Sequence, residues 1–334
     1  MLKIKRTICF LLLLLLALLS FAACGEKETG EDEETSVIYT VTFQTNGGEA
    51  IAPIQVIGGN PIAEPPLLTR EGYVFGEWLH DGAVWDFRAP VEENMTLTAT
   101  WISVDTLFEY ERIGETDTAM ITGLVGKTSR VAIPEVIGGY RVVAIESEAF
   151  AEVSSADIEE IIVPKTVSAI GAYAFRDTKE IPVIISEEAR ITELGEGAFL
   201  NCAGLKSIEL GEGLEVVPFQ AFSGCTGLSE LRLPESVSVL EENAFEGCTS
   251  LVTIMMHKGV SSVEDGAFAD CDALRTVFFH GTAEEAESLL SEKTAGMNDA
   301  LENATVYLYS EEEPSVESEY GFWYFDRNGK AKIW

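Results

Sequence analysis

The sequence predicts a mainly β protein: a small β domain followed by a solenoid of stacked coils with short helical or irregular turns. Three observations predict it. An Ala-Phe dipeptide recurs six times at intervals of 23 to 25 residues, and apolar columns keep step with it. Before the repeats, β-branched and aromatic residues alternate with polar ones between Gly and Pro breaks. The dipeptides end at Phe150, Phe175, Phe199, Phe222, Phe245 and Phe268.

A fixed period in the low twenties is the spacing of leucine-rich-repeat solenoids, in which each coil buries its apolar residues against its neighbours. After each of the last four Phe residues, a Cys stands three positions later, and a Leu and two alternating apolar residues follow. That alternation predicts one short strand per coil and a parallel sheet along the solenoid. With the six Phe, the expected core ladder includes Cys202, Cys225, Cys248 and Cys271.

The pattern G-x-x-A-F-x-x-C-x-x-L-x-x-I-x-L begins at Gly195 and, with Glu in place of the first Gly, again at Glu264. It is similar to the BspA-like, Treponema-type leucine-rich repeats over about residues 108–310. The first two units depart from the pattern, with Val153 and Thr178 in the Cys column. The resemblance implies a leucine-rich-repeat solenoid of the kind found on bacterial surface proteins implicated in adhesion to host or community partners.

The first 23 residues are predicted to be a lipoprotein signal peptide. Lys3, Lys5 and Arg6 precede a short apolar run, and small residues lead to Cys24, which is the arrangement of a secretory signal. The resemblance to lipoprotein signals implies a lipid on Cys24. An uncleaved anchor helix is the alternative, because the run comes close to the ~17 residues that span a bilayer. Either way, we expect the rest outside the cytoplasm, anchored to the outer face of the bacterial cell membrane, with 24–36 as an acidic flexible tether.

Residues 37–102 are expected to form the small β domain. Its strands are separated by a tight turn and by Gly and Pro. The residues that carry the pattern are Val41-Thr42-Phe43, Asn46-Gly47-Gly48, Gly72-Tyr73-Val74-Phe75, Trp78, Trp85-Asp86-Phe87 and Thr96-Leu97-Thr98-Ala99-Thr100-Trp101. This set looks like one InlB B-repeat of the Listeria-Bacteroides type, which implies a β-grasp-like domain used as a spacer or weak binding unit. Without the resemblance, the aromatic residues are most simply the core of a small domain.

The chain is strongly acidic, with 22 Lys and Arg against 56 Asp and Glu and a formal net charge of −34. A charge of this sign disfavours nucleic acid and anionic lipid surfaces as partners. It could attract a basic ligand or divalent cations, but acidity more often serves solubility. We expect a monomer that binds protein partners and contacts the lipid membrane through its Cys24 anchor.

The six Cys residues raise disulfide and metal hypotheses. Cys9 and Cys24 belong to the signal, and the other four share one inward column of successive coils. Side chains in register, about 4.8 Å apart, point the same way rather than at each other. Buried free thiols are therefore favoured over one disulfide. A zinc site is disfavoured because zinc ligands usually come in close local pairs.

No catalytic site is visible in the sequence. Only His80, His257 and His280 are present, and the chain has no nucleophile elbow, phosphate loop or metal-binding helix motif. Carboxylates are so abundant that a chance pair carries no information. We therefore predict a protein that is not an enzyme and has no cofactor and no metal.

Outward positions on the last two coils are a candidate partner-binding patch. His257 and His280 lie one period apart, and Met255 and Phe278 share the strand face that points away from the core, where an earlier coil has Arg232. Outward apolar residues grouped in this way often mark a contact site. The alternative, which we favour for these positions, is that the C-terminal segment folds over them as a cap.

The C-terminal region 283–334 is expected to cap the solenoid with a helix, a strand and a hairpin. Residues 283–293 have a helical pattern and residues 304–309 alternate as a strand; both resemble closing elements of the BspA-like family. The segment from Tyr320 resembles a Gly-aromatic choline-binding repeat. One copy cannot build such a site, so a capping role is favoured over glycan or choline binding. The remaining boundaries are 103–145 for an N-terminal cap and first coil, and 146–282 for the repeats.

Together these features predict a cell-surface lipoprotein that acts as a protein-binding or adhesion module. The parallel-sheet face of the leucine-rich repeats is the surface expected to bind. A structural scaffolding protein of the bacterial envelope is the alternative, and a glycan-binding protein is a more remote one.

Overall fold

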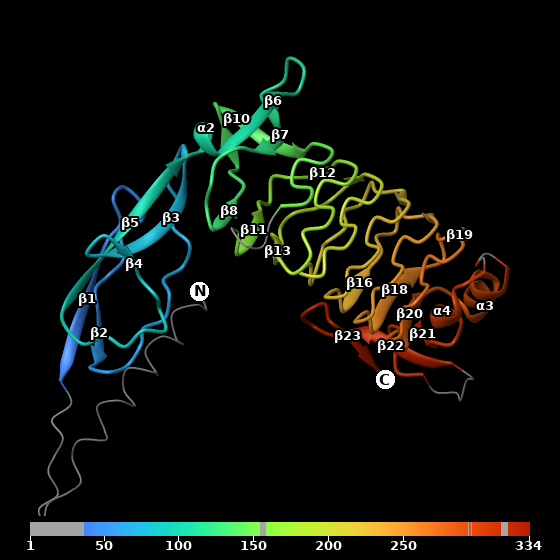
Figure 1. The fold of residues 1–334 in the computed structure, drawn as a ribbon. Helices are drawn as coiled ribbons and strands as arrows, with labels where there is room; N and C mark the ends of the chain where they lie inside the picture. The colour runs from blue at the N-terminus through green and yellow to red at the C-terminus, as the bar shows by residue number, and fades with distance from the viewer. Residues whose placement is uncertain (1–36, 154–157, 293, 295, 315–319) are drawn as a thin grey trace, which may run out of the picture. The chain divides into compact units, whose positions relative to one another are not determined.

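A computed structural model describes residues 37–153, 158–292, 294, 296–314 and 320–334 (Figure 1). The expected signal peptide and tether, residues 1–36, lie outside the described residues. From Tyr39 onward the chain forms one unit built mainly of short strands, which confirms the predicted fold class. Within the described ranges, no helix is both long enough and apolar enough to cross a bilayer.

The first domain is a sheet made of β1 (Ile38–Gln44), β2 (Ile54–Ile57), β3 (Tyr73–His80), β4 (Ala83–Val84) and β5 (Met95–Ser103). The order across the sheet is β2-β1-β5-β3-β4, with β1 parallel and β3 antiparallel to β5. Alternate side chains enclose a core around Trp78 and Leu97, which are 3% and 0% exposed. Residues 38–103, all of them described, contain no helix. The connection from β2 to β3 carries three Pro residues, which disfavour one.

The solenoid begins with α2 (Val104–Leu107), β6 (Phe108–Arg112) and β7 (Thr118–Leu124). β6 pairs antiparallel with β7. Leu107 and Phe108, 0% and 2% exposed, belong to the same buried cluster as the coils that follow. This segment therefore covers the apolar side of the first coil, as the open end of a solenoid requires.

Strands of the coils form two parallel rows, whereas the sequence predicted one strand per coil. The first row consists of β8 (Arg130–Ala132), β11 (Glu160–Val163), β13 (Val183–Ile185), β16 (Glu230–Arg232), β18 (Thr253–His257) and β20 (Thr276–His280). The second row consists of β10 (Tyr140–Ile145), β12 (Ala169–Ile170), β14 (Glu193–Leu194), β15 (Val216–Val217), β17 (Val239–Leu240) and β19 (Ser262–Val263), and β9 (Val136–Ile137) pairs with β10. The first row is interrupted once, between β13 and β16, and the second row is interrupted once, between β14 and β15. Most second-row strands have two residues, too few to show an alternation in sequence.

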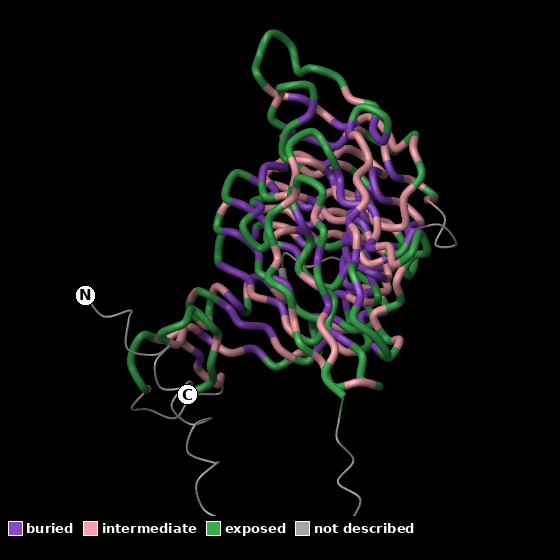
Figure 2. The backbone as a smooth tube through the Cα atoms, turned by 90° about the vertical axis from the view of Figure 1, so that its left-hand side faces the viewer, coloured by how far each residue is buried: buried purple, intermediate pink, exposed green. Residues whose placement is uncertain are grey.

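The six Phe side chains stack in one column inside the coils. Successive ring centroids are 5.2 to 5.5 Å apart, and the ring planes lie within 13° of parallel. All six rings are 0% exposed. Each of the first five Phe N–H groups donates to the Ala carbonyl of the next coil, as Phe222 does to Ala244 at 2.8 Å. Ring packing and backbone hydrogen bonds therefore couple each coil to its neighbours, and buried segments recur from coil to coil (Figure 2).

Sharp bends on both sides of each Phe use left-handed backbone. The residues two positions before and two positions after every ladder Phe have φ between +53° and +72°. Gly, Asn or Asp fill eight of these twelve positions, as expected for a conformation that L side chains rarely adopt. At Gly197, an added Cβ would also lie 2.3 Å from the ring of Tyr173. This backbone geometry is what turns the chain twice within each coil.

The four ladder Cys residues are buried free thiols, each 0% exposed. Each Sγ donates to the carbonyl oxygen of the Phe one coil earlier at 2.9 to 3.2 Å, as Cys225 does to Phe199 at 3.1 Å. Burial raises the pKa of Cys202 to about 12 and raises the pKa of Cys225 well above its ordinary value. A neutral thiol is thus both a small apolar side chain and a donor that satisfies a buried carbonyl.

The last coil is covered by α3 (Ala283–Glu292), α4 (Asp299–Glu302), β21 (Thr305–Tyr309), β22 (Gly321–Phe325) and β23 (Ala331–Ile333). β21 and β22 extend the first row in parallel beyond β20, and β23 turns back antiparallel to β22. Asn298, 0% exposed, accepts the N–H of Phe268 through Oδ1 at 2.7 Å. Its Nδ2 donates to the carbonyl of Glu264 at 2.9 Å. One side chain therefore replaces the backbone that a further coil would supply.

Candidate interaction surface

The outward face of the first row ends in a group of aromatic side chains. In register, Arg232 on β16 lies beside Met255 on β18, which lies beside Phe278 on β20 and then Tyr307 on β21. Because alternate residues of a strand point to opposite faces, these side chains share the face away from the Phe ladder. We call the following residues the aromatic patch: Arg232, Met255, Phe278, His280, Tyr307, Tyr309, Trp323 and Phe325.

Trp323 is the centre of the aromatic patch. Its ring centroid lies 5.2 Å from that of Phe278, 5.0 Å from Tyr309 and 4.9 Å from Phe325. Its Nε1–H donates to the carbonyl of Phe279 at 3.2 Å, and the residue is 2% exposed. Edge-on and tilted ring contacts of this kind stabilise beyond the area that they bury. Trp323 therefore fastens the C-terminal hairpin onto the last coil.

Two residues of the predicted partner-binding patch are covered. Phe278 is 8% exposed and His257 is 3% exposed, so neither presents an open surface. The physical reason is that β21 and β22 extend the sheet past β20 and place Trp323 against Phe278. Arg232 and His280 are exposed and Met255 is partly exposed, so these three remain accessible on the outward face.

His257 is held in one orientation by backbone groups. Its Nδ1 accepts the N–H of Gly259 at 3.0 Å, which leaves the ring proton on Nε2 to donate to the carbonyl of Pro234 at 2.7 Å. A Cβ on Gly259 would lie 2.8 Å from the ring, so this close approach needs glycine. The side chain thus serves packing and turn geometry rather than contact with a partner.

The accessible part of the patch contains charged groups around a very small pocket. Nδ1 of His280 lies 3.0 Å from Oε1 of Glu235, and its ring meets that of Tyr309 edge-on at 4.6 Å. The guanidinium of Arg232 lies 5.1 Å from the ring centroid of Phe325, a cation–π distance. The pocket between them has a volume of about 40 Å³, whereas drug-sized ligands need several hundred. This surface is suited to contact with a macromolecule rather than to enclosing a small molecule.

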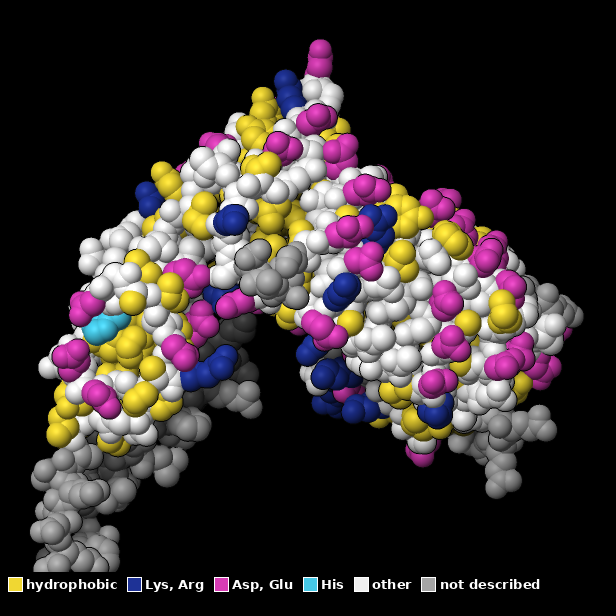
Figure 3. Space-filling view, in the orientation of Figure 1, with side chains coloured by type: hydrophobic (Ala, Val, Ile, Leu, Met, Phe, Trp, Pro, Cys, Tyr) yellow, Lys and Arg dark blue, Asp and Glu magenta, His cyan; other side chains and the backbone are white. Residues whose placement is uncertain are grey.

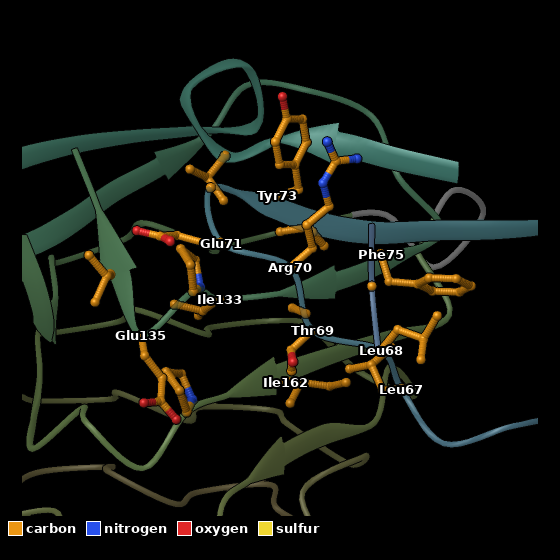
Figure 4. A pocket seen from close by; sticks show the side chains of 18 of the residues that line it. Leu67, Leu68, Thr69, Arg70, Glu71, Tyr73, Phe75, Ile133, Glu135 and Ile162 are labelled. Atoms are coloured by element: carbon orange, nitrogen blue, oxygen red, sulfur yellow. The ribbon is translucent and has the colours of Figure 1, made fainter. Parts of the chain in front are cut away.

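A larger pocket of about 1090 Å³ is lined by residues of β3, β8 and β11 and by neighbouring loops (Figure 4). On its β3 side, the guanidinium of Arg70 lies 4.0 Å from the ring centroid of Tyr73 and donates to the carbonyl of Asn46 at 3.1 Å. The lining includes no His and no Cys. Over the described ranges, no group of three potential metal ligands occurs. The pocket has the volume for a ligand, and its lining carries Arg70, Lys165 and five carboxylates.

Comparison with known families identifies both repeat types. Residues 143–275 match the model of the BspA type leucine rich repeat region, in six copies, and residues 39–100 match the Listeria-Bacteroides repeat domain. The chain carries a BspA-type leucine-rich repeat region and a Listeria-Bacteroides repeat domain. Both resemblances read from the sequence are thus confirmed. The six BspA-type copies contain the whole Phe ladder and four of the strands of the first row.

Two curated relatives are similar to this chain over only a short part of their own length. Two proteins of Evansella cellulosilytica, provisionally named a Gly-rich membrane protein and a membrane protein, are 29% identical over 101 residues and 40% identical over 67 residues. These matches cover 29% and 19% of this chain. The chain spans about a tenth of the length of these relatives, 12% and 10%.

Two solved structures are similar to parts of this chain. A leucine-rich repeat protein of T. pallidum is 25% identical, with a TM-score of 0.47, and the match covers 58% of this chain and 97% of that one. A leucine rich cell surface protein of Faecalibacterium prausnitzii is 24% identical, with a TM-score of 0.42, covering 69% of this chain and 60% of that one.

Proposed function

We propose that the chain is a non-enzymatic cell-surface protein that binds other proteins, as an adhesion module, through the outward face of its first row. The main support is the accessible part of the aromatic patch, where exposed Arg232 and His280 adjoin partly exposed Met255, Tyr309 and Phe325. Aromatic residues, Met and Arg are the residue types enriched in protein interfaces. Repeat solenoids commonly bind along such extended surfaces, and the BspA-type repeats favour the same class of function.

A pull-down with residues 37–334 would test this proposal. We expect the wild-type protein to capture a protein partner and the Arg232→Glu variant to capture much less of that partner. Lys206→Glu is the matched control, because Lys206 is also an exposed cation of the repeat region. Its substitution by Glu changes the net charge by the same amount. Equal capture by all three proteins would exclude the patch as the binding surface. Recovery of only the cell's own envelope proteins would favour the scaffolding alternative over adhesion.

We further propose that Cys24 carries a lipid that holds the protein on the outer face of the cell membrane. The support is the signal pattern of residues 1–23 and the membrane-protein names of the two Evansella relatives. In this arrangement residues 24–36 are a tether and residues 37–102 a spacer or weak binding unit. Residues 103–145 are the N-terminal cap and first coil, 146–282 the repeats and 283–334 the C-terminal cap. Metabolic labelling with a lipid precursor should tag the wild type but not Cys24→Ala. A labelled Cys24→Ala protein would rule the anchor out.

A further inference from the structure

The C-terminal hairpin, β22 and β23 with their turn, differs in charge from the rest of the molecule. In a chain with 22 Lys and Arg against 56 Asp and Glu, residues 320–334 contain three cationic side chains and one acidic side chain. Arg327, Lys330 and Lys332 are all exposed. Figure 3 shows Lys and Arg side chains gathered where this hairpin lies. The hairpin is therefore a local positive surface on an acidic protein.

The three hairpin cations have no ion-pair partner among the described residues. The acidic side chain within the hairpin, Asp326, is bound by the turn itself: its Oδ1 accepts the N–H of Asn328 at 2.8 Å and that of Lys330 at 3.0 Å. The backbone N–H of Lys330, and after it that of Asn328, stabilises the carboxylate and so holds the pKa of Asp326 below its usual value. The adjoining connection carries exposed Glu311, Glu312 and Glu313, none of which pairs with the hairpin.

The turn that carries the cations is fixed by further backbone bonds. Asp326 N–H donates to the carbonyl of Lys330 at 2.8 Å, and Gly329 N–H donates back to the carbonyl of Asp326 at 2.9 Å. Gly329 has φ of +75°, which such a turn requires and glycine tolerates. The cations are thus held on a preorganised turn, and little ordering of the backbone is needed when an anion binds.

A pair of stacked aromatic rings, one of them exposed, lies beside the cations. The rings of Tyr324 and Trp334 are stacked at 4.1 Å, and Nε1–H of Trp334 donates to the carbonyl of Ser310 at 3.1 Å. Trp334 is nevertheless 42% exposed and its neighbour Ile333 is 51% exposed. A fixed, exposed indole can pack against the C–H groups of a sugar ring, because the faces of aromatic rings attract weakly positive C–H edges.

We propose that the C-terminal hairpin binds an anionic polysaccharide, with Arg327, Lys330 and Lys332 pairing with its acidic groups and Trp334 packing against its sugar rings. A flexible polymer can touch the hairpin alone. A flat anionic bilayer would also face the acidic surface around it, which opposes close approach. An acidic peptide would use the cations but has no sugar ring for Trp334. The two sides of the hairpin then have separate roles, since Trp323 on the inner side caps the solenoid.

Binding of the full mature protein to polygalacturonate, a polymer of sugar carboxylates, would test the proposal, with neutral dextran as the uncharged comparison. We expect binding to polygalacturonate that weakens as salt is raised, and no binding to dextran. Arg327→Glu/Lys330→Glu/Lys332→Glu should weaken binding at least about tenfold, since each cation near an anionic surface contributes severalfold. Trp334→Phe should weaken binding by a smaller factor without changing its salt dependence.

The control variant carries the same change in charge elsewhere: Arg88→Glu/Lys127→Glu/Lys206→Glu reverses three exposed cations outside the hairpin. It should bind polygalacturonate nearly as well as wild type, and circular dichroism should show both triple variants folded. Equal losses in both would mean that net charge, not the hairpin, controls binding. Equally tight binding to poly-glutamate, or to vesicles of anionic phospholipid, would overturn a polysaccharide site. Loss of protein capture in Arg232→Glu is a separate outcome, because Arg232 is not among the substituted residues.

Discussion

The amide nitrogen of Phe268 lies 2.7 Å from Oδ1 of Asn298, a residue 30 positions later that belongs to no repeat. In the preceding coils the same amide bonds to the Ala carbonyl of the next coil, as Phe245 does to Ala267 at 2.8 Å. Asn298 thus continues the hydrogen-bond column for one step beyond the last repeat. A solenoid needs such an end, because an exposed final coil would leave buried donors without acceptors.

Asn298→Leu should therefore destabilise the end of the solenoid. Leucine keeps the approximate volume but removes the acceptor for Phe268 N–H and the donor to the carbonyl of Glu264. Leaving buried groups unsatisfied costs about 1–3 kcal/mol each. Denaturant unfolding should show the loss, and amide exchange at Phe268 should speed up most. Asn303→Ala, at an exposed site on the same segment, is the control. An equal midpoint for the two variants would contradict the capping role.

The position of each Phe in the ladder should decide the cost of removing it. Phe222 stacks on Phe199 and Phe245, whereas Phe150 at the end has one stacked neighbour, Phe175. Phe→Ala in a core costs about 3–5 kcal/mol, and each aromatic contact contributes about 0.5–1.5 kcal/mol beyond area. Phe222→Ala should lower the free energy of unfolding by about 1 kcal/mol more than Phe150→Ala does. Denaturation of the two variants measures the difference, and the reverse order would show that stacking does not set it.

The ladder was predictable because its residues repeat in identity as well as position. Phe and Cys recur at one spacing, and burial of both follows from that spacing alone. The left-handed residues two positions from each Phe were not predicted, since Tyr173 and Glu148 occupy that column as well as Gly and Asn. The conformation there is imposed by the packed coil, which overrides the preference of the single residue.

The sequence predicted that the C-terminal segment covers part of the outward patch, but it did not predict which strands do so or in what register. The alternation of residues 304–309 indicated a strand, yet its register with β20 depends on pairing across a connection that includes α3 and α4. The role of Asn298 was missed for the same reason: it depends on proximity in space to Phe268, and a residue without a repeat leaves no periodic signal.

Stability should fall at high pH because of the buried thiols. Burial raises the pKa of Cys202 from the ordinary 9.0 to about 12, so the folded state holds a proton that the unfolded state releases. The stabilisation is complete below about pH 9 and is lost as pH rises toward 12, by up to about 1.4 kcal/mol per pH unit. Unfolding midpoints measured from pH 8 to 10.5 should show it. Cys202→Ser keeps a donor for the carbonyl of Phe175 and does not titrate in this range, so its profile should be flatter; parallel profiles would contradict the assignment.

A glutamate at position 278 should unfold the cap rather than merely block a partner. Phe278 is 8% exposed beneath Trp323, and a carboxylate placed there loses its hydration against the indole ring. Phe278→Glu should therefore lower the free energy of unfolding by roughly 3 kcal/mol or more. Ile184→Glu is the matched control, because Ile184 is on the outward side of β13 in the same row but is 46% exposed, so its substitution should cost little. If thermal unfolding gave the two variants equal midpoints, the C-terminal strands would not be packed on β20 in solution, and Phe278 would return to the accessible binding surface.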